Sequence, residues 1–245
     1  MSKQKIYVVG IGPGAYQEMT GAAVAALEQS DVIVGYTVYI DLVKEHFSDK
    51  AFLTTPMRKE VDRCVMAFEE AKKGQTVSMI CSGDAGVYGM AGLIYEISKR
   101  YPDVEIEIIP GVTAAIGGAS VLGAPLIHDF CLISLSDLLT PWEKIEARLL
   151  GASQADFVIC LYNPSSKKRH DYLQKACDLM MQYKSPETVC GTVCNIGREG
   201  EEYQVMTLKE LRDTQVDMFT TVFIGNSQTK EINGKMVTPR GYRNV

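Results

Sequence analysis

Three short glycine-containing loops carry the residues best suited to bind a small polar ligand. They span 10–14, 82–89 and 110–114, and each directly follows an apolar run of the strand type. Glycine has no Cβ atom, so a ligand can approach the backbone of such loops closely. Backbone amides at strand ends, together with the Asp84 carboxylate, favour a charged or strongly polar ligand group. The sequence therefore predicts one ligand site built from the three loops.

Loop 10–14 and Asp84 each leave a second interpretation open. Loop 10–14 formally matches the dinucleotide fingerprint G-x-G-x-x-G/A. However, Pro13 interrupts the loop, the next helix begins only after the capping residue Thr20, and Asp31 opens the following strand instead of closing it. A nicotinamide-dependent oxidoreductase is therefore kept only as the alternative outside the favoured class. For Asp84 the simpler alternative is the N-cap of a helix.

Strands and helices that alternate along the chain must position these loops. Apolar runs predict strands at 6–9, 32–34, 77–80, 104–109, 131–135, 157–161, 189–194 and 221–224. Helical apolar spacing occurs at 61–68, 87–94 and 173–180. Such alternation is typical of α/β proteins with largely parallel sheets. Because segment 123–129 interrupts the pattern, we expect two α/β domains, 1–123 and 124–245, with a cleft between them as the site.

Composition excludes several classes of protein. The 245 residues include 25 basic and 30 acidic side chains, which argues against a nucleic-acid partner. The uncharged stretch 108–127 contains Pro110, Pro125 and four glycines, so we interpret it as strand, turn and helix and expect no membrane span. Seven cysteines without a Cys-x-x-Cys pair predict free thiols, no metal site and a cytoplasmic location.

The three loops together resemble the tetrapyrrole (corrin/porphyrin) methyltransferase family. The matching motifs are G-x-G-P-G at 10–14 with Met19-Thr20, the G-D loop at 82–88, and P-G-V-T at 110–113. One departure is Ala85, where many members have proline. The resemblance implies a tetrapyrrole methylase fold, distinct from Rossmann-type methyltransferases. It also implies S-adenosyl-L-methionine as methyl donor, with S-adenosyl-L-homocysteine as product, and a tetrapyrrole substrate in an open trough.

The second half is most similar to family members that methylate C-17 of a corrin precursor and contract the ring in cobalamin biosynthesis. The matching segments are 129–143, 161–169, 195–200 and 220–227. Methylation of another corrin carbon or of uroporphyrinogen remains the alternative within the family, and a non-enzymatic ligand-binding protein remains one outside it. The resemblance further implies a homodimer.

Residue roles carry over position by position. The resemblance implies donor binding by Pro13, Gly83, Asp84, Val87, Thr113, Ala114, Tyr162, Asn195, Ile196, Gly197 and Thr221. The substrate is expected to contact glycines of the first loop and basic side chains, and the basic side chains pair with its acetate and propionate groups. These residues are Gly12, Gly14, Arg58, Lys167, Lys168, Arg169 and Arg198. A solvated helix start is the alternative for 167–169. Ring contraction needs a proton donor or acceptor, for which the candidates are Asp84, His128, Ser134 and Ser136.

Overall fold

The computed structural model describes residues 4–166 and 170–243. The chain packs as two compact units, Met1–Ala114 and Ala115–Val245. This division falls before the boundary at 123/124 that we expected, because the helix α5 (Ala114–Leu122) packs on the sheet of the second unit. A Cβ atom at Gly118 of α5 would lie 2.9 Å from the Phe223 ring, so glycine lets this helix approach the sheet closely.

The first unit contains a five-stranded parallel sheet. Its strands are β1 (Lys5–Gly10), β2 (Val32–Tyr36), β3 (Ala51–Thr55), β4 (Thr76–Cys81) and β5 (Glu105–Ile109), in the order β3-β2-β4-β1-β5. All carboxyl ends therefore lie at one edge of the sheet, and β4, β1 and β5, which the glycine loops follow, are neighbours. The expectation that the three loops share an edge is confirmed.

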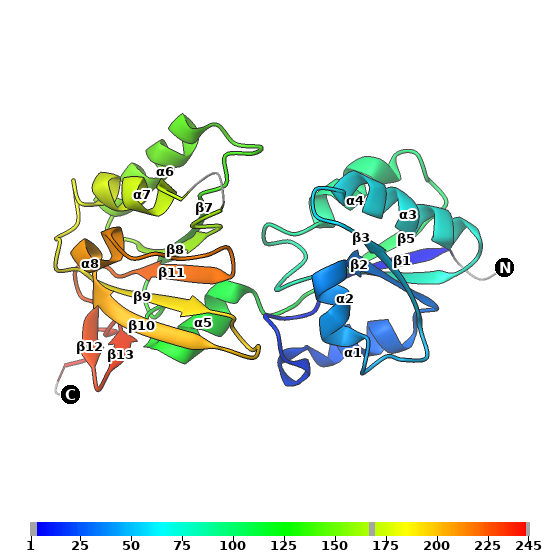
Figure 1. Ribbon diagram of the computed structural model, residues 1–245, viewed down its shortest axis with the longest axis horizontal. Coiled ribbons are helices and arrows are strands. Elements are labelled where there is room, and N and C mark those ends of the chain that lie inside the picture. Colours follow the sequence, from blue (N-terminus) through cyan, green and yellow to red (C-terminus); the bar gives the residue numbers. More distant parts are fainter. Residues whose placement is uncertain (1–3, 167–169, 244–245) are drawn as a thin grey trace. The chain divides into compact units, whose positions relative to one another are not determined.

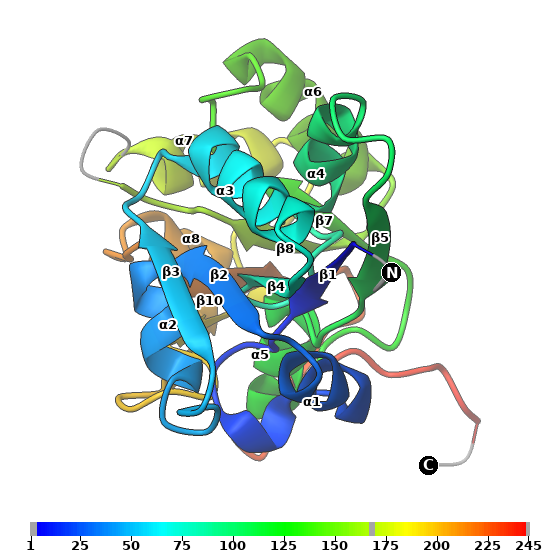
Figure 2. The same cartoon turned by 90° about the vertical axis from the view of Figure 1, so that its right-hand side faces the viewer.

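Helices cover both faces of this sheet (Figures 1 and 2). One face packs on α3 (Glu60–Lys72) and α4 (Ala91–Ser98), and the other on α1 (Gly21–Glu28) and α2 (Thr37–Val43). Strand β1 shows the cause, because Ile6 and Val8 belong to the first core and Tyr7 and Val9 to the second. Two apolar faces explain why its sequence is a continuous apolar run.

The second unit contains a mixed sheet. Its strands are β7 (Phe130–Ser134), β8 (Val158–Tyr162), β9 (Val189–Cys194), β10 (Glu202–Thr207) and β11 (Thr220–Ile224), in the order β10-β9-β11-β8-β7. Strands β7 and β8 pair in parallel, and the other neighbours pair antiparallel. Helices α6 (Trp142–Gln154), α7 (Tyr172–Met180) and α8 (Leu208–Arg212) pack on the face opposite α5. A small sheet joins β6 (Gly123–Ala124), β12 (Lys230–Ile232) and β13 (Lys235–Val237).

The first unit differs from the sequence predictions in two places. The apolar spacing at 87–94 predicts a helix, but α4 begins only at Ala91. Tyr88 instead adopts a left-handed backbone (φ 54°), and a Cβ atom at Gly89 would overlap the carbonyl oxygen of Ala85. The segment is therefore a folded-back loop. In addition, α2 and β3 have no counterpart among the elements we expected. Within the described residues, no helix is long and apolar enough to cross a membrane.

Candidate active site

Backbone hydrogen bonds join the first two glycine loops directly. Gly12 and Gly83 exchange two of them, at 3.1 and 2.7 Å, and the Ile11 amide donates to the Cys81 carbonyl at 2.9 Å. Both glycines have positive φ angles, 77° and 69°, which residues with a Cβ atom rarely adopt. The Ile11 bond continues the parallel β1–β4 pair, and Gly12 and Gly83 then form an isolated antiparallel bridge between the two loops.

Glycines 10 and 111 make room for the loops themselves. A Cβ atom at Gly10 would lie 2.7 Å from both the Gly111 nitrogen and the Gly83 carbonyl oxygen. A Cβ atom at Gly111 would overlap the carbonyl oxygens of Gly10 and Gly83. We expected these positions to admit a ligand, but their first requirement is the close packing of three backbones on one another.

The Asp84 carboxylate joins the second loop to the third. Its Oδ1 accepts from the Gly86 amide at 2.8 Å, and its Oδ2 accepts from the Gly111 amide at 2.9 Å. Asp84 does not cap α4. The N-cap position of α4 is Met90, and Asp84 lies six residues before Met90. Both oxygens of this half-buried side chain hold backbone donors, as charge-assisted hydrogen bonds.

The structure brings the expected donor-binding residues of the first unit together. Val87 is half-buried, and its amide donates to the Asp84 carbonyl at 3.4 Å. Thr113, two residues after Gly111, is half-buried, whereas Pro13 is buried in the first loop. These residues surround the same edge of the sheet as the hydrogen bonds described above.

Two arginines lie at the carboxyl end of β3. Arg58, expected to bind substrate, is exposed and has a left-handed backbone (φ 66°). Arg63, which our sequence analysis missed, is buried; its Nε donates to Thr55 Oγ1 at 2.9 Å and its Nη2 to the Pro56 carbonyl at 3.3 Å. Its position four residues before Ala67, on the buried stripe of α3, was the available signal. Lys167, Lys168 and Arg169 lie outside the described residues.

The expected donor-binding residues of the second unit gather around α5. The Ala115 amide in the first turn of this helix donates to the Tyr162 hydroxyl at 2.8 Å. A Cβ atom at Gly118 would lie 3.0 Å from Ile196 Cδ1. Thr221 is only 5% exposed.

The turn after β9 holds the remaining expected residues. Asn195 has a left-handed backbone (φ 51°), and its Nδ2 donates to the Gly200 carbonyl at 3.4 Å. The Gly197 amide donates to Glu201 Oε2 at 2.7 Å. Arg198, expected to bind substrate, is half-buried and lies over the Phe219 ring, 6.0 Å from its centroid.

The candidates for proton transfer in the second unit lie at opposite ends of β7. Ser134 ends this strand, and its Oγ accepts from Asn163 Nδ2 at 3.0 Å and from the Ser136 amide at 3.2 Å. His128 precedes the strand and its Nε2 donates to the Pro239 carbonyl at 3.0 Å. At about 3.3 Å per extended residue, the two side chains lie roughly 15–20 Å apart. They therefore cannot act on one atom together.

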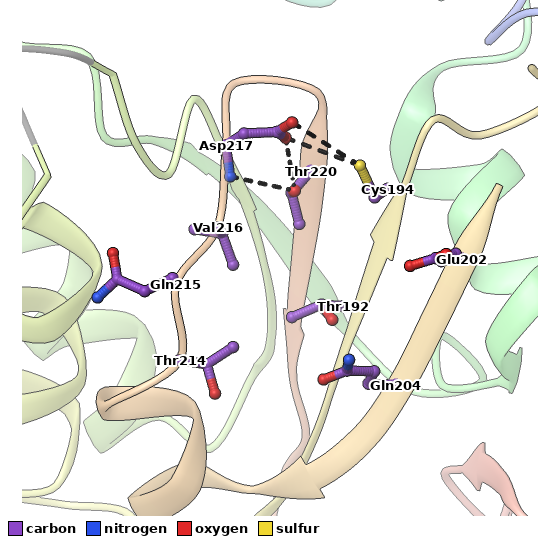
Figure 3. Close-up of a pocket in the computed structure, with 9 residues that line it drawn as sticks. All are labelled: Thr192, Cys194, Glu202, Gln204, Thr214, Gln215, Val216, Asp217 and Thr220. Atoms are coloured by element: carbon purple, nitrogen blue, oxygen red, sulfur yellow. Dashed lines mark hydrogen bonds between the residues drawn. The ribbon is translucent and has the colours of Figure 1, made fainter. Parts of the chain in front are cut away.

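A cavity of about 440 Å³ lies elsewhere in the second unit, between the sheet and the segment after α8 (Figure 3). None of the expected site residues lines it. Its lining residues are Thr192, Cys194, Glu202, Gln204, Thr214, Gln215, Val216, Asp217 and Thr220. Cys194 Sγ lies 3.7 Å from Asp217 Oδ1, which also accepts from Thr220 Oγ1 at 2.8 Å.

The thiols are expected to react slowly in the folded protein. Burial raises the pKa of Cys64 to about 12 and of Cys81 to about 11, and burial and the Asp217 carboxylate raise that of Cys194. At pH 7 nearly all thiols are therefore protonated and unreactive. Timed alkylation followed by mass spectrometry should modify the half-buried Cys194 and Cys131 first, and all seven cysteines after denaturation. Equally fast modification of Cys64 would contradict this expectation.

The fold and the loop geometry define a class of protein. The chain belongs to the Tetrapyrrole (Corrin/Porphyrin) Methylases, whose family model matches residues 5–212. This confirms the expected family and its α/β fold, which is not that of Rossmann-type methyltransferases.

Individual relatives narrow the comparison to one activity. The chain is 50% identical to a probable cobalt-factor III C(17)-methyltransferase of Salmonella typhimurium, over 96% of this chain and 98% of that one. It is 40% identical to a precorrin-3B C(17)-methyltransferase of a Sinorhizobium species, over 97% and 96% of the two chains. The crystal structure of the methyltransferase CobJ matches with a TM-score of 0.88 and 34% identity, over 96% of this chain and 99% of that one. The chain spans 46% and 54% of two longer curated relatives.

Proposed function

We propose that the protein transfers a methyl group from S-adenosylmethionine to C-17 of a corrin precursor, with contraction of the macrocycle, in cobalamin biosynthesis. The hydrogen-bonded loops at the carboxyl edge of the first sheet carry the proposal. These bonds hold the three family motifs against one another, which supports a donor site at this edge. The likeness to C(17)-methyltransferases over nearly the whole chain supports the choice of carbon.

The donor supplies a methyl group that its sulfonium already activates, so the chain has mainly to bind and align it. In the first unit, Gly83, Val87, Thr113 and Ala114 offer backbone and hydroxyl groups on loops whose positions Asp84 fixes. Pro13 adds an apolar contact beside them. In the second unit we assign the donor-binding residues Tyr162, Asn195, Ile196, Gly197 and Thr221.

The substrate is a macrocycle with several carboxylate groups, and we propose that it contacts Gly12 and Gly14 and pairs with basic side chains. Arg58 and Arg198 are the described candidates, and 167–169 remain candidates from the sequence. We favour the cobalt-containing precursor as substrate, because identity to the cobalt-factor III enzyme (50%) exceeds identity to the precorrin-3B enzyme (40%).

For proton transfer during ring contraction we favour Ser134 among the candidates. Its hydroxyl accepts from Asn163 and from a backbone amide, so its own hydrogen is directed elsewhere. The His128 Nε2 and both Asp84 oxygens are already engaged by backbone groups. We further propose a cytoplasmic homodimer. The free thiols suit a reducing compartment, and light scattering of the purified protein tests the dimer.

Incubation with S-adenosylmethionine and either cobalt-factor III or precorrin-3B tests the proposed function. We expect the product to gain one methyl group at C-17, established by mass spectrometry and NMR, with faster turnover of the cobalt form. Calorimetry should detect binding of S-adenosylhomocysteine and none of NAD. Methylation at another carbon would overturn the C-17 assignment, and binding of NAD alone would favour the oxidoreductase.

A further inference from the structure

One threonine hydroxyl serves two distant parts of the first unit. Thr20 Oγ1 accepts from the Ala23 amide at 3.0 Å and thereby caps α1. The same hydroxyl donates to the Pro110 carbonyl at 3.1 Å, ninety residues further along the chain. Capping needs an acceptor only, so the contact with Pro110 is an additional use of the hydroxyl hydrogen.

This contact closes a ring of hydrogen bonds through the three glycine loops. Loop 10–14 binds loop 82–89 through the paired backbone bonds of Gly12 and Gly83. Loop 82–89 binds loop 110–114 through Asp84 and the Gly111 amide. Loop 110–114 then returns to the first segment through Thr20. Loop 82–89 is therefore bound to both other loops, and loop 110–114 is bound to loop 82–89 and to Thr20, which lies six residues after loop 10–14.

Thr20 and Asp84 hold opposite sides of one peptide unit in the third loop. Thr20 donates to the Pro110 carbonyl oxygen, and Asp84 accepts from the amide of the next residue, Gly111. These two groups belong to the same planar peptide bond, so the two contacts together fix its orientation. The residues that follow, Thr113 and Ala114, are those assigned to donor binding.

We propose that Thr20 is a positioning residue, which orders loop 110–114 for the methyl donor through the Pro110 carbonyl. The proposal rests on the proposed function, since it assumes that this loop binds the donor. The physical reason is preorganisation. A loop already held in its binding conformation needs no ordering when the ligand arrives, and affinity is lost when that ordering must accompany binding.

Substitutions of Thr20 distinguish its role as the cap of α1 from its hydrogen bond to the Pro110 carbonyl. Thr20→Ser retains a hydroxyl for both contacts and should bind S-adenosylhomocysteine within about twofold of the natural chain. Thr20→Asp keeps a good helix cap but has no hydrogen to donate, and its charge repels the Pro110 carbonyl. We expect Thr20→Asp to weaken binding by about tenfold in calorimetry, the equivalent of one hydrogen bond.

A matched control is Thr207→Val in the second unit. Thr207 Oγ1 caps α8 by accepting from the Glu210 amide at 3.2 Å, and Thr207 is not among the proposed site residues. This variant should lower the melting temperature and leave S-adenosylhomocysteine affinity unchanged. Loss of donor affinity through general destabilisation is thereby distinguished from loss through the third loop.

Hydrogen–deuterium exchange provides a readout without any ligand. Peptides covering 108–114 should exchange faster in Thr20→Asp than in the natural chain, Thr20→Ser or Thr207→Val. If the natural chain fails to bind S-adenosylhomocysteine, the proposed function fails. The exchange rates of 108–114 would still test whether Thr20 orders this loop. If Thr20→Asp exchanges and binds like the natural chain, the role of Thr20 is overturned.

Discussion

Asp84→Ala is expected to lower donor affinity and turnover by about 100-fold or more in a protein that still folds. The substitution removes both the Gly86 and the Gly111 contacts of the carboxylate, at 2.8 and 2.9 Å. Hydrogen bonds to a charged group contribute about 1.5–3 kcal/mol each, and each 1.4 kcal/mol is a factor of ten. Calorimetry with S-adenosylhomocysteine and steady-state turnover measure the loss.

Asp84→Asn distinguishes a positioning role from proton transfer. The amide oxygen can still accept from one of the two backbone groups, so a positioning role predicts an intermediate loss of both affinity and turnover. If the carboxylate instead transfers a proton, Asp84→Asn should abolish turnover and leave donor affinity nearly unchanged.

Asp31→Ala is the matched control for Asp84→Ala. Asp31 Oδ2 accepts from the Thr76 amide at 2.8 Å, at the amino edge of the same sheet. We expect this variant to lose some stability and no donor affinity. Equal loss of affinity in both variants would reduce Asp84 to a contributor to stability.

The edge at which the glycine loops meet was predictable because parallel strands align their carboxyl ends. Knowing that 6–9, 77–80 and 104–109 are strands joined by helices is enough to place their following loops on one side. The residues that contact one another at this edge were not predictable. The contact between Thr20 and Pro110 spans ninety residues and leaves no pattern in either local sequence. The mutual packing of Gly10 and Gly111 is equally invisible, since a glycine that serves a ligand looks the same in sequence.

The proton-transfer candidates show the limit of choosing residues by chemical type. His128 was chosen as a side chain able to donate or accept a proton. In the structure the segment after β13 passes beside it, and the Pro239 carbonyl accepts from its ring. Arg63 shows the converse failure. A charged side chain ordinarily favours the surface, but the spacing of Arg63 places it on the buried face of α3. In both cases tertiary contacts outweighed the intrinsic preference of the side chain.

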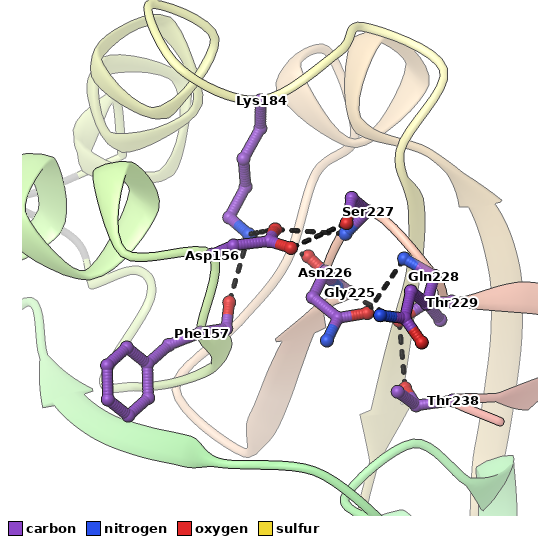
Figure 4. A network of polar contacts seen from close by, with 9 residues as sticks. All are labelled: Asp156, Phe157, Lys184, Gly225, Asn226, Ser227, Gln228, Thr229 and Thr238. Atoms are coloured by element: carbon purple, nitrogen blue, oxygen red, sulfur yellow. Dashed lines mark hydrogen bonds and ion pairs between the residues drawn. The ribbon is translucent and has the colours of Figure 1, made fainter. Parts of the chain in front are cut away.

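Lys184→Met is expected to lower the free energy of unfolding by about 3 kcal/mol. Lys184 is buried, and its Nζ donates to the carbonyls of Phe157 and Gly225 at 2.9 Å each (Figure 4). Nζ also pairs with Asp156 Oδ1 at 3.6 Å. Methionine fills the space but leaves two carbonyls without a donor, although Asp156 keeps its bonds from Ser227. Urea unfolding measures the loss. Lys44→Met, which breaks an exposed pair with Asp41, is the control and should change stability by less than about 1 kcal/mol.

The pH dependence of this difference tests the charge of the buried amine. Burial lowers the pKa of Lys184 below its ordinary value of 10.5, so between the lowered pKa and 10.5 the unfolded chain binds more protons than the folded one. Stability therefore rises with pH across that window. The neutral amine still has two hydrogens for the two carbonyls. The advantage of the natural chain over Lys184→Met should consequently grow as the pH rises through the lowered pKa. An advantage that stays constant below pH 10.5 and shrinks above it would mean that the Asp156 pair outweighs burial and keeps the folded amine charged.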